Sequence, residues 1–230
     1  MEHADDLVRW SAALGVHLDG SHLDRFSLYL QELLDWNQKI NLSGISHQRD
    51  IVLKHFVDSM ACLKAIDTPQ SGSLSLLDIG SGAGFPGIPL NIINPDLEVT
   101  LLEPNLKKTA FLHHIIGTLQ LSRISVVSMR LEDYARRANH PLFTHAITRA
   151  VNLLSLMNCV TPLLEDGGCL ILCRSTPLEH AEKDGYGNFV LEREIDYELP
   201  HHAGTRVLSV LKPMRQGVPR GTLRAGCGQA

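Results

Sequence analysis

The most constraining feature of this sequence is a short apolar run at 74–79 that ends directly in a cluster of glycines. Similar apolar runs recur at 99–102, 124–127, 145–148 and 169–173, and stretches with helical periodicity lie between them. Strands that alternate with helices form βαβ units, which build a parallel sheet through right-handed crossovers. The pattern therefore predicts an α/β fold, a sheet flanked by helices.

The segments on either side of this pattern have a different character. Before it, apolar residues with spacings of three and four predict three helices, at 7–14, 23–40 and 50–66. A stretch rich in Pro, Ser and Gly at 69–73 is typical of a linker. After it, runs at 188–198 and 205–211 predict a closing pair of strands joined by a turn.

Three segments follow from these boundaries. We expect an N-terminal helical extension over 1–70, an α/β domain over 71–213, and a basic, flexible tail over 214–230. The tail contains several glycines and three arginines, and it has no acidic residue, so it can contact phosphate.

Composition excludes several classes of protein. The chain has 230 residues, of which 44% are hydrophobic and 20% charged, a profile typical of a folded globular protein. No apolar run is long enough to span a membrane, and the acidic start lacks the pattern of a secretory signal. Five cysteines do not indicate a disulfide framework, so we expect a protein of the reducing cytoplasm. A net charge of −4 excludes a uniformly basic coat, and the His and Cys spacings predict no metal site.

The glycine cluster predicts a ligand site at the end of the first strand. Gly80, Gly82 and Gly84 allow the backbone to approach a ligand closely, and the sequence from Gly82 onward matches the dinucleotide pattern G-x-G-x-x-G. Two neighbours argue against a dinucleotide. Asp78 would repel a pyrophosphate, and Pro86 removes an N–H donor at the start of the helix. The carboxylate instead suits S-adenosylmethionine, whose sulfonium and ammonium are cationic.

Two acidic residues have alternative roles at this site. Asp78 can either face a cationic ligand or brace the glycine loop. Glu103 ends the next strand run, where a carboxylate can accept both ribose hydroxyls of a nucleoside. Enzymes that bind NAD use the same device, so Glu103 does not distinguish the two cofactors.

Four sequence blocks together resemble a known family. They are 36–43 (WNQKINLS), 55–59 (HFVDS), 78–90 (DIGSGAGFPGIPL) and 147–150 (ITRA). In this order they are similar to RsmG, also called GidB, the bacterial 16S ribosomal RNA guanine-N7 methyltransferase. The resemblance covers approximately 25–212, and it is specific because the four blocks occur together.

The resemblance implies a fold, a cofactor and a substrate. The fold would be the Rossmann-like sheet of the class I S-adenosylmethionine-dependent methyltransferases, with the N-terminal helical extension added. The methyl group would go from S-adenosylmethionine to N7 of a guanine (position 527) in the 530 loop of 16S rRNA. The expected partner is this RNA or the 30S subunit, and we expect a monomer that binds no membrane.

The family's donor-binding positions transfer to particular residues of this chain. The resemblance places them at Gly80, Phe85, Leu131-Glu132 and Arg149. The glycines Gly82 and Gly84 and the acids Asp78 and Glu103 join this set through the chemistry described above. One departure is visible after the fifth strand run, where Arg174-Ser175 replaces the family's Lys-Gly.

Methyl transfer to guanine N7 needs no general base, because N7 carries a lone pair and no proton. Alignment of the reacting atoms should then supply most of the catalysis. Arg149 is the catalytic candidate: it follows the fourth strand run and can hold the donor's carboxylate or an RNA phosphate, or it can form only a salt bridge. His55 and Asp58 share a helix face and can close the donor site, contact RNA, or serve packing and capping.

Three rival functions remain open at the level of sequence. The first is methylation of a small molecule, which would proceed without RNA. The second is a non-catalytic RNA-binding assembly factor that retains a donor pocket. The third is an NAD-dependent oxidoreductase, which Asp78 and Pro86 oppose. Cys169 and Cys173 fall in a predicted buried strand and are expected to be core residues rather than nucleophiles.

Overall fold

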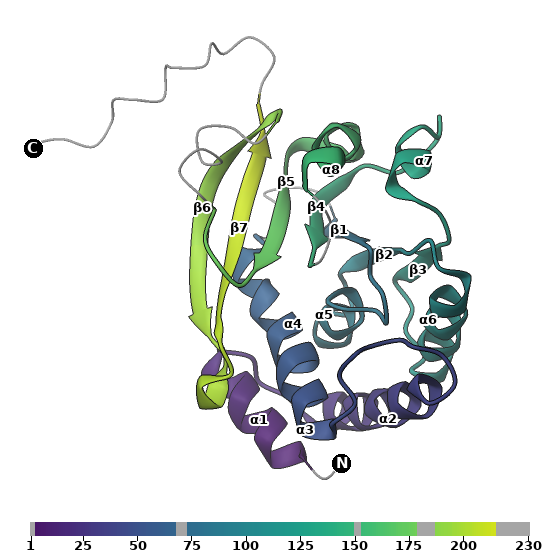
Figure 1. The fold of residues 1–230 in the computed structure, drawn as a ribbon, viewed down its shortest axis with the longest axis vertical. Helices are drawn as coiled ribbons and strands as arrows, with labels where there is room; N and C mark the ends of the chain where they lie inside the picture. Colours follow the sequence, from purple (N-terminus) through teal and green to yellow (C-terminus); the bar gives the residue numbers. More distant parts are fainter. Residues whose placement is uncertain (1–2, 68–72, 150–152, 179–186, 215–230) are drawn as a thin grey trace, which may run out of the picture.

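The computed structural model describes residues 3–67, 73–149, 153–178 and 187–214 (Figure 1). The strands are β1 (Ser75–Ile79), β2 (Glu98–Leu102), β3 (Ile124–Val127), β4 (Phe143–Thr148), β5 (Leu164–Arg174), β6 (Phe189–Glu198) and β7 (Thr205–Pro213). The α-helices are α1 (Ala4–Ala13), α2 (Gly20–Asn37), α3 (Gln48–Ile51), α4 (Asp58–Ala61), α5 (Gly87–Ile93), α6 (Leu106–Thr118), α7 (Leu131–Ala135) and α8 (Leu153–Val160).

The strands form one mixed sheet in the order β3-β2-β1-β4-β5-β7-β6. The first five strands in this order pair in parallel, whereas β7 runs antiparallel between β5 and β6. The chain order reverses at β1, between β2 and β4, which is the position where open α/β sheets bind ligands at the carboxyl ends of their strands. The predicted α/β fold with a closing antiparallel pair is therefore confirmed.

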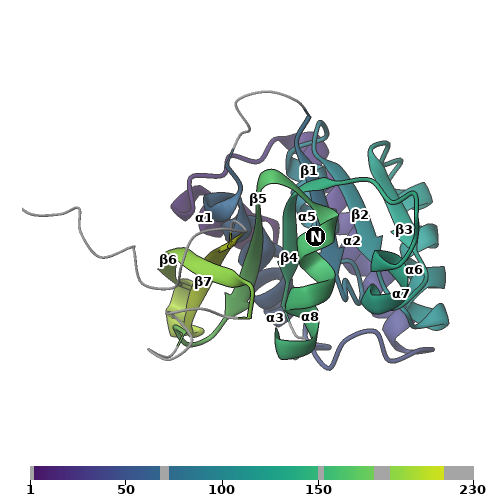
Figure 2. The ribbon, with the colours of Figure 1, turned by 90° about the horizontal axis from the view of Figure 1, so that it is seen from above.

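Helices cover both faces of the sheet (Figure 2). Adjacent β1 residues Leu76 and Leu77 are both fully buried and belong to two different core clusters, because successive strand side chains point to opposite faces. The larger cluster joins one face to residues of α1, α2, α4, α5 and α6, and the smaller joins the other face to α7 and α8. The N-terminal helices thus share a core with the sheet.

Local sequence explains where the longest helices begin. Asp19 caps α2 by accepting from the backbone N–H of His22, and the His22 side chain accepts in return from the N–H of Asp19. Asn105 caps α6 in the same manner by accepting from Lys107 and Lys108. These caps satisfy N–H groups that the first helical turn leaves without partners.

The third predicted helix is present but irregular. Between α3 and α4 the chain forms a π-helical segment, Val52–Val57, and a 3₁₀ turn, Cys62–Ala65, follows α4. The sequence pattern did not predict this irregularity, nor the short helix α7. π-Helical segments are rare and occur often at functional sites. The predicted linker at 69–73 and the basic tail at 214–230 lie almost entirely outside the described residues.

Candidate functional site

The glycine cluster forms a tight turn between β1 and α5. Gly80, Gly82 and Gly84 have φ values of 71°, 61° and 97°, in the left-handed region where a side chain causes strain. A Cβ atom on Gly84 would also lie 2.4 Å from Cδ1 of Ile88 and 2.8 Å from the hydroxyl of Tyr29. Gly84 is therefore required for packing as well as for conformation.

Two buried carboxylates brace this turn from beneath. Asp78 is 1% exposed, and its Oδ2 accepts from the backbone N–H of Gly87 at 2.8 Å. Glu103 accepts from the N–H of Gly82 and from the N–H of Asn105, both at 2.9 Å. Burial raises the pKa of Asp78 to about 7. Of the two roles considered for Asp78, the structure shows the bracing one.

A cavity of about 520 Å³ opens above the glycine turn. Its walls come from the loop after α2, the π-helical segment, the glycine turn, and the ends of β4 and β5, together with β6 and β7. The lining residues are Leu42, Ser43, Ile45, Lys54, His55, Asp58, Gly80, Ser81, Gly82, Ala83, Phe85, Lys108, Arg149, Cys173, Arg174, Ser175, Tyr197 and Arg206. We call this cavity the glycine-turn pocket.

The structure brings some of the predicted site residues together and leaves others apart. Gly80, Gly82, Phe85 and Arg149 line the glycine-turn pocket. Five other predicted positions do not line it, namely Asp78, Gly84, Glu103, Leu131 and Glu132. Gly84 belongs to the glycine turn, and Asp78 and Glu103 brace that turn without lining the pocket. Leu131 is buried in the smaller core cluster, and Glu132 is exposed on α7.

The charge of the lining differs from the expectation of a pocket guarded by carboxylates. Among the described residues of the lining, Asp58 is the single acidic side chain, and the basic residues are Lys54, Lys108, Arg149, Arg174 and Arg206. The basic excess favours anionic ligand groups, such as a carboxylate or a phosphate. Contact between Asp78 and a cationic sulfur is therefore not supported, because that carboxylate is buried under the turn.

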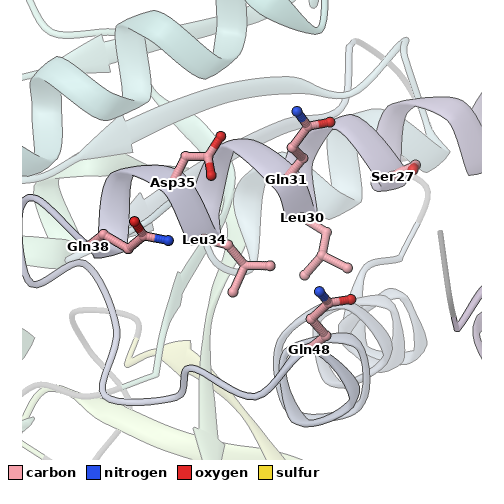
Figure 3. A pocket seen from close by; sticks show the side chains of 7 residues that line it. All are labelled: Ser27, Leu30, Gln31, Leu34, Asp35, Gln38 and Gln48. Atoms are coloured by element: carbon pink, nitrogen blue, oxygen red, sulfur yellow. The ribbon is translucent and has the colours of Figure 1, made fainter.

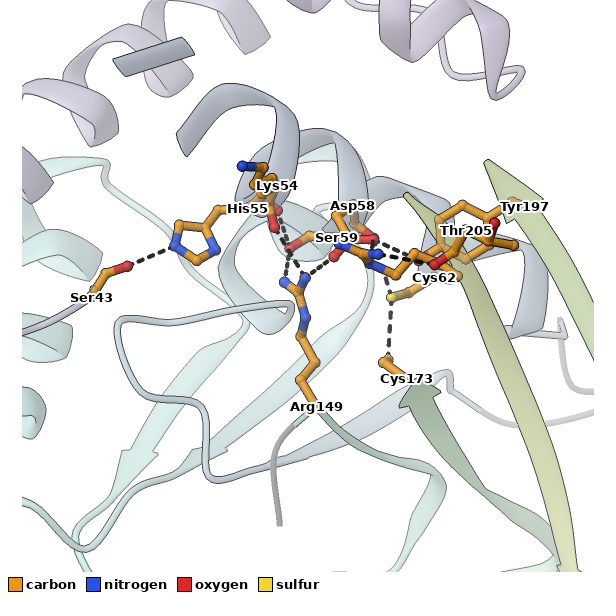
Figure 4. A network of polar contacts seen from close by, with 11 residues as sticks. Ser43, Lys54, His55, Asp58, Ser59, Cys62, Arg149, Cys173, Tyr197 and Thr205 are labelled. Carbon is orange, nitrogen blue, oxygen red and sulfur yellow. Dashed lines mark hydrogen bonds and ion pairs between the residues drawn. The ribbon is translucent and has the colours of Figure 1, made fainter. Parts of the chain in front are cut away.

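A polar network centred on Asp58 organises one wall of the pocket (Figure 4). Asp58 is 4% exposed; one carboxylate oxygen forms an ion pair with the Arg149 guanidinium, and the other accepts from the Tyr197 hydroxyl at 2.7 Å. Arg206 Nε lies 3.7 Å from the same oxygen as Tyr197. Asp58 thus connects α4 to the end of β4 and to both strands of the closing pair.

Arg149 is held by more than Asp58. Its guanidinium also donates to the Ser59 hydroxyl at 3.2 Å and to the Lys54 carbonyl at 3.1 Å. Burial alone would lower the pKa of Arg149, but the opposite charge of Asp58 raises it above the usual value. The predicted contact with a donor carboxylate or a phosphate stays a prediction. The structure adds that Arg149 is anchored at the pocket wall by its own chain.

His55 presents an aromatic ring to the pocket. The imidazole stacks on Phe85 with ring centroids 4.5 Å apart and an interplanar angle of 11°. Its Nε2 lies 2.8 Å from the Ser43 hydroxyl. Asn37 holds the loop that carries Ser43, because its side-chain oxygen accepts from the N–H groups of Leu42 and Ser43. The sequence blocks around Asn37 and His55 therefore meet at one wall.

His55 should make stability depend on pH. Burial, and then the nearby Arg149 charge, lower the pKa of His55 to about 4. Below pH 6.5 this imidazole is protonated in the unfolded chain but stays neutral in the folded chain. The contribution of His55 to the free energy of unfolding is therefore complete above pH 6.5 and is lost as the pH falls toward 4. The difference in free energy of unfolding between wild type and His55→Gln should fall by on the order of 3 kcal/mol across this pH window. Denaturant titrations at each pH measure it. A difference between wild type and His55→Gln that stays constant across this window would contradict the assignment.

Ser81 carries an unsatisfied polar atom at the pocket. Its hydroxyl is buried, lines the glycine-turn pocket, and has no hydrogen-bond partner within the part of the chain that the structure describes. Buried hydroxyls are normally hydrogen-bonded, so such an atom in a pocket marks a position where a bound ligand can supply the missing partner.

A second hollow lies along α2 and has a different character (Figure 3). Its volume is about 380 Å³, and its lining is Ser27, Leu30, Gln31, Leu34, Asp35, Gln38 and Gln48. Gln31 lies on α2, Gln38 follows its end, and Gln48 begins α3; the described lining contains no basic side chain. Across the described ranges we find no group of three His, Cys, Asp or Glu side chains that can hold a metal ion. The same ranges contain no helix long and apolar enough to cross a membrane.

Several pocket residues carried no signal in the sequence. Tyr197 and Arg206 lie in the closing strand pair, far along the chain from the glycine turn. Local pattern cannot show that they reach it, because the placement depends on how β7 inserts between β5 and β6. Cys173 was expected in the core but is partly exposed and lines the pocket, whereas Cys169 is buried at 2% exposure as expected.

Comparison with known proteins identifies the family. A model of the GidB family, described as rRNA small subunit methyltransferase G, matches residues 22–207. The chain belongs to this family. A relative named ribosomal RNA small subunit methyltransferase G from Acetivibrio thermocellus is 35% identical over 216 residues, which cover 91% of this chain and 88% of the relative. One of the same name from Alkaliphilus oremlandii is 32% identical, covering 98% and 97%. The resemblance of the four sequence blocks is thereby confirmed.

Solved structures agree on the fold. TrmN from Thermus thermophilus superposes with a TM-score of 0.56 at 16% identity, over 69% of this chain and 48% of that one. A ribosomal protein L11 methylase from Lactobacillus delbrueckii gives 0.52 at 13% identity, over 70% and 79%. The chain therefore has the Rossmann-like fold of the class I S-adenosylmethionine-dependent methyltransferases, with additional N-terminal helices, and spans about half of TrmN.

Proposed function

We propose that the protein transfers a methyl group from S-adenosylmethionine to N7 of a guanine in the 530 loop (position 527) of 16S rRNA. The observation that carries the proposal is the glycine-turn pocket at the carboxyl edge of β1, in a chain that belongs to the rRNA small subunit methyltransferase G family. The relatives' names state a ribosomal RNA substrate of the small subunit. The N7 position and the loop are the finer part of the proposal.

The residues of the pocket fit the methyl donor. Its volume of about 520 Å³ lies in the range of cofactor and ligand sites. The unsatisfied Ser81 hydroxyl can bond to a polar group of the donor, and the basic excess of the lining suits the donor's carboxylate. Gly82 lines the pocket, and a Cβ atom there would meet nothing closer than 3.9 Å among the described residues.

The chain's own residues have roles that this reaction requires. S-Adenosylmethionine, when bound, supplies a methyl group on a positively charged sulfur. N7 of guanine has no proton to lose, so the pocket needs to orient the base and not to deprotonate it. His55, whose pKa of about 4 keeps it neutral near pH 7, offers an uncharged ring that does not repel a guanine becoming cationic. Lys54, Arg174 and Arg206 at the rim can contact RNA phosphates.

We assign Arg149 as a positioning residue of this site. Its guanidinium fixes the π-helical segment through Lys54 and α4 through Asp58 and Ser59. The residue thus holds the wall that carries His55 against the glycine turn. A direct contact with the donor carboxylate or an RNA phosphate would add to this role, because a guanidinium offers five N–H donors.

The function is tested by methyl transfer to purified 30S subunits and to naked 16S rRNA, using radiolabelled S-adenosylmethionine. Subunits carrying guanine in the 530 loop should accept label, and matched subunits with adenine at position 527 should not. Chain cleavage specific for N7-methylguanine should then map the product. Equal labelling of both substrates would contradict the site, labelling of a small molecule without RNA would favour that rival, and donor binding without transfer would favour an assembly factor.

Ser81 provides a test of the donor site. Replacing Ser81 with alanine should weaken S-adenosylmethionine binding by about fivefold, because a hydrogen bond of this kind contributes about 1 kcal/mol. Isothermal titration calorimetry measures the change. Ser27→Ala, in the α2 hollow, is the matched control and should bind like wild type. Equal affinities of Ser81→Ala and wild type would show that the donor does not reach this hydroxyl.

A further inference from the structure

Two cysteines from distant parts of the chain meet behind the glycine-turn pocket. Cys62 begins the 3₁₀ turn after α4, and Cys173 lies one residue before the end of β5. Their sulfur atoms are 3.7 Å apart although the residues are 111 positions apart in sequence (Figure 4). Both are free thiols in the structure.

We propose that Cys62 and Cys173 form a reversible disulfide that switches off the methyl transfer proposed above, the reduced enzyme being the active form. The inference rests on the proposed function for its consequence, but not for the bond itself. Disulfides that form transiently in reducing compartments are typical of redox-sensitive sites. The chemical partner is a low-molecular-weight disulfide of the glutathione type.

The exposure of the two thiols sets the order of events. Cys173 is partly exposed and lines the pocket, whereas Cys62 is 1% exposed. The hydrogen bond with Cys173, and then burial, raise the pKa of the Cys62 thiol. Cys173 is therefore the thiol that an oxidant reaches first, and Cys62 is the one that resolves the intermediate.

The reaction balances as two thiol–disulfide exchanges. The Cys173 thiolate attacks one sulfur of the small disulfide, forms a mixed disulfide and releases one small thiolate. The Cys62 thiolate then attacks the Cys173 sulfur, closes the protein disulfide and releases the second small thiolate. The two protons lost by the protein thiols go to these thiolates, and the two electrons reduce the small disulfide.

Closing the bond must move one wall of the pocket. A disulfide requires sulfur atoms about 2.05 Å apart, so the two sulfurs approach by roughly 1.7 Å from their present separation. Cys62 follows Asp58 by one helical turn, and its thiol donates to the Asp58 carbonyl at 3.6 Å. The shift therefore acts on the short helix whose carboxylate holds Arg149 and Tyr197. Misplacement of a reacting group by about 1 Å can cost about a hundredfold in rate.

The experiment follows bond and activity together on the full chain. The protein is equilibrated in glutathione buffers from fully reduced to fully oxidised, its free thiols are blocked with N-ethylmaleimide, and proteolysis with mass spectrometry quantifies the peptide linked through Cys62 and Cys173. Aliquots are assayed for methyl transfer to 30S subunits. We expect the linked peptide to rise while activity falls at least tenfold, with recovery after dithiothreitol.

Variants locate the effect. Cys173→Ala protein, compared with its own reduced form, should no longer respond to oxidised glutathione, and Cys159→Ala should respond like wild type. Cys62→Ala should stop at the mixed disulfide on Cys173, without the linked peptide. Absence of the linked peptide, unchanged activity when it has formed, or an equal loss in Cys173→Ala would each overturn the proposal. Reduced wild-type protein that methylates nothing would contradict the proposed function alone, because the linked peptide is detected without turnover.

Discussion

Asp58→Ala is expected to lower the free energy of unfolding by about 3 kcal/mol and to remove nearly all methyl transfer. The substitution takes the buried carboxylate away from the Arg149 guanidinium and from the Tyr197 hydroxyl, so a charge and a polar group lose their partner at once. Breaking a buried ion pair from one side is costly because the remaining charge stays desolvated. Urea denaturation gives the stability change, and the 30S assay gives the activity change.

Two matched variants separate the charge from the position. Asp58→Asn keeps the shape and can still accept from Tyr197 but loses the ion pair, so it should fall between wild type and Asp58→Ala. Asp35→Ala removes an exposed carboxylate on α2 and should change stability by less than about 0.5 kcal/mol. If Asp58→Ala unfolds at the same urea concentration as Asp35→Ala, the network does not stabilise the fold.

Gly84→Ala should be the most damaging single change in the glycine turn, lowering the free energy of unfolding by about 3 kcal/mol. The backbone there has φ of 97°, and the new methyl group would lie 2.4 Å from Ile88 and 2.8 Å from the Tyr29 hydroxyl. Relief of the clash would displace α2 or α5, both of which pack against the turn. S-Adenosylmethionine binding should weaken as well, because the turn forms the pocket floor.

Gly117→Ala is the matched control for this change. Gly117 lies inside α6, and a Cβ atom added there would meet no neighbouring side chain within 4 Å among the described residues. Alanine should therefore stabilise the protein by about 0.5–1 kcal/mol through helix propensity. In thermal denaturation, Gly84→Ala should therefore lower the melting temperature, whereas Gly117→Ala should raise it. Equal melting temperatures of the Gly84→Ala and Gly117→Ala proteins would contradict the packing described for the turn.

The fold could be predicted from the sequence because the pattern of apolar residues changes near residue 70, from helical spacing to short apolar runs. Helical spacing before residue 70 and short apolar runs after it correspond to α1–α4 and to β1–β5. The π-helical segment Val52–Val57 escaped prediction, since its apolar spacing also fits a regular helix and only tertiary packing selects the wider turn. The five residues of α7 are too few for periodicity to be measured.

The site was predictable only where it is local. The glycine turn could be predicted because its conformation requires glycine at every second position, 80, 82 and 84. The role of Asp78 could not, because a carboxylate beside a glycine turn serves a ligand or the backbone equally well until its burial is known. Tyr197 and Arg206 reach the pocket through a strand pairing distant in sequence, for which the residues themselves contain no local pattern.

The contact between α2 and the glycine turn has a consequence for protein engineering. Tyr29, fully buried on α2, donates its hydroxyl to the Ala83 carbonyl inside the turn, and its ring stacks on Phe85. The leading helices therefore cannot be exchanged as an independent module. A chimera that grafts this catalytic half onto a foreign N-terminal segment would need to supply an equivalent phenol from the new helix.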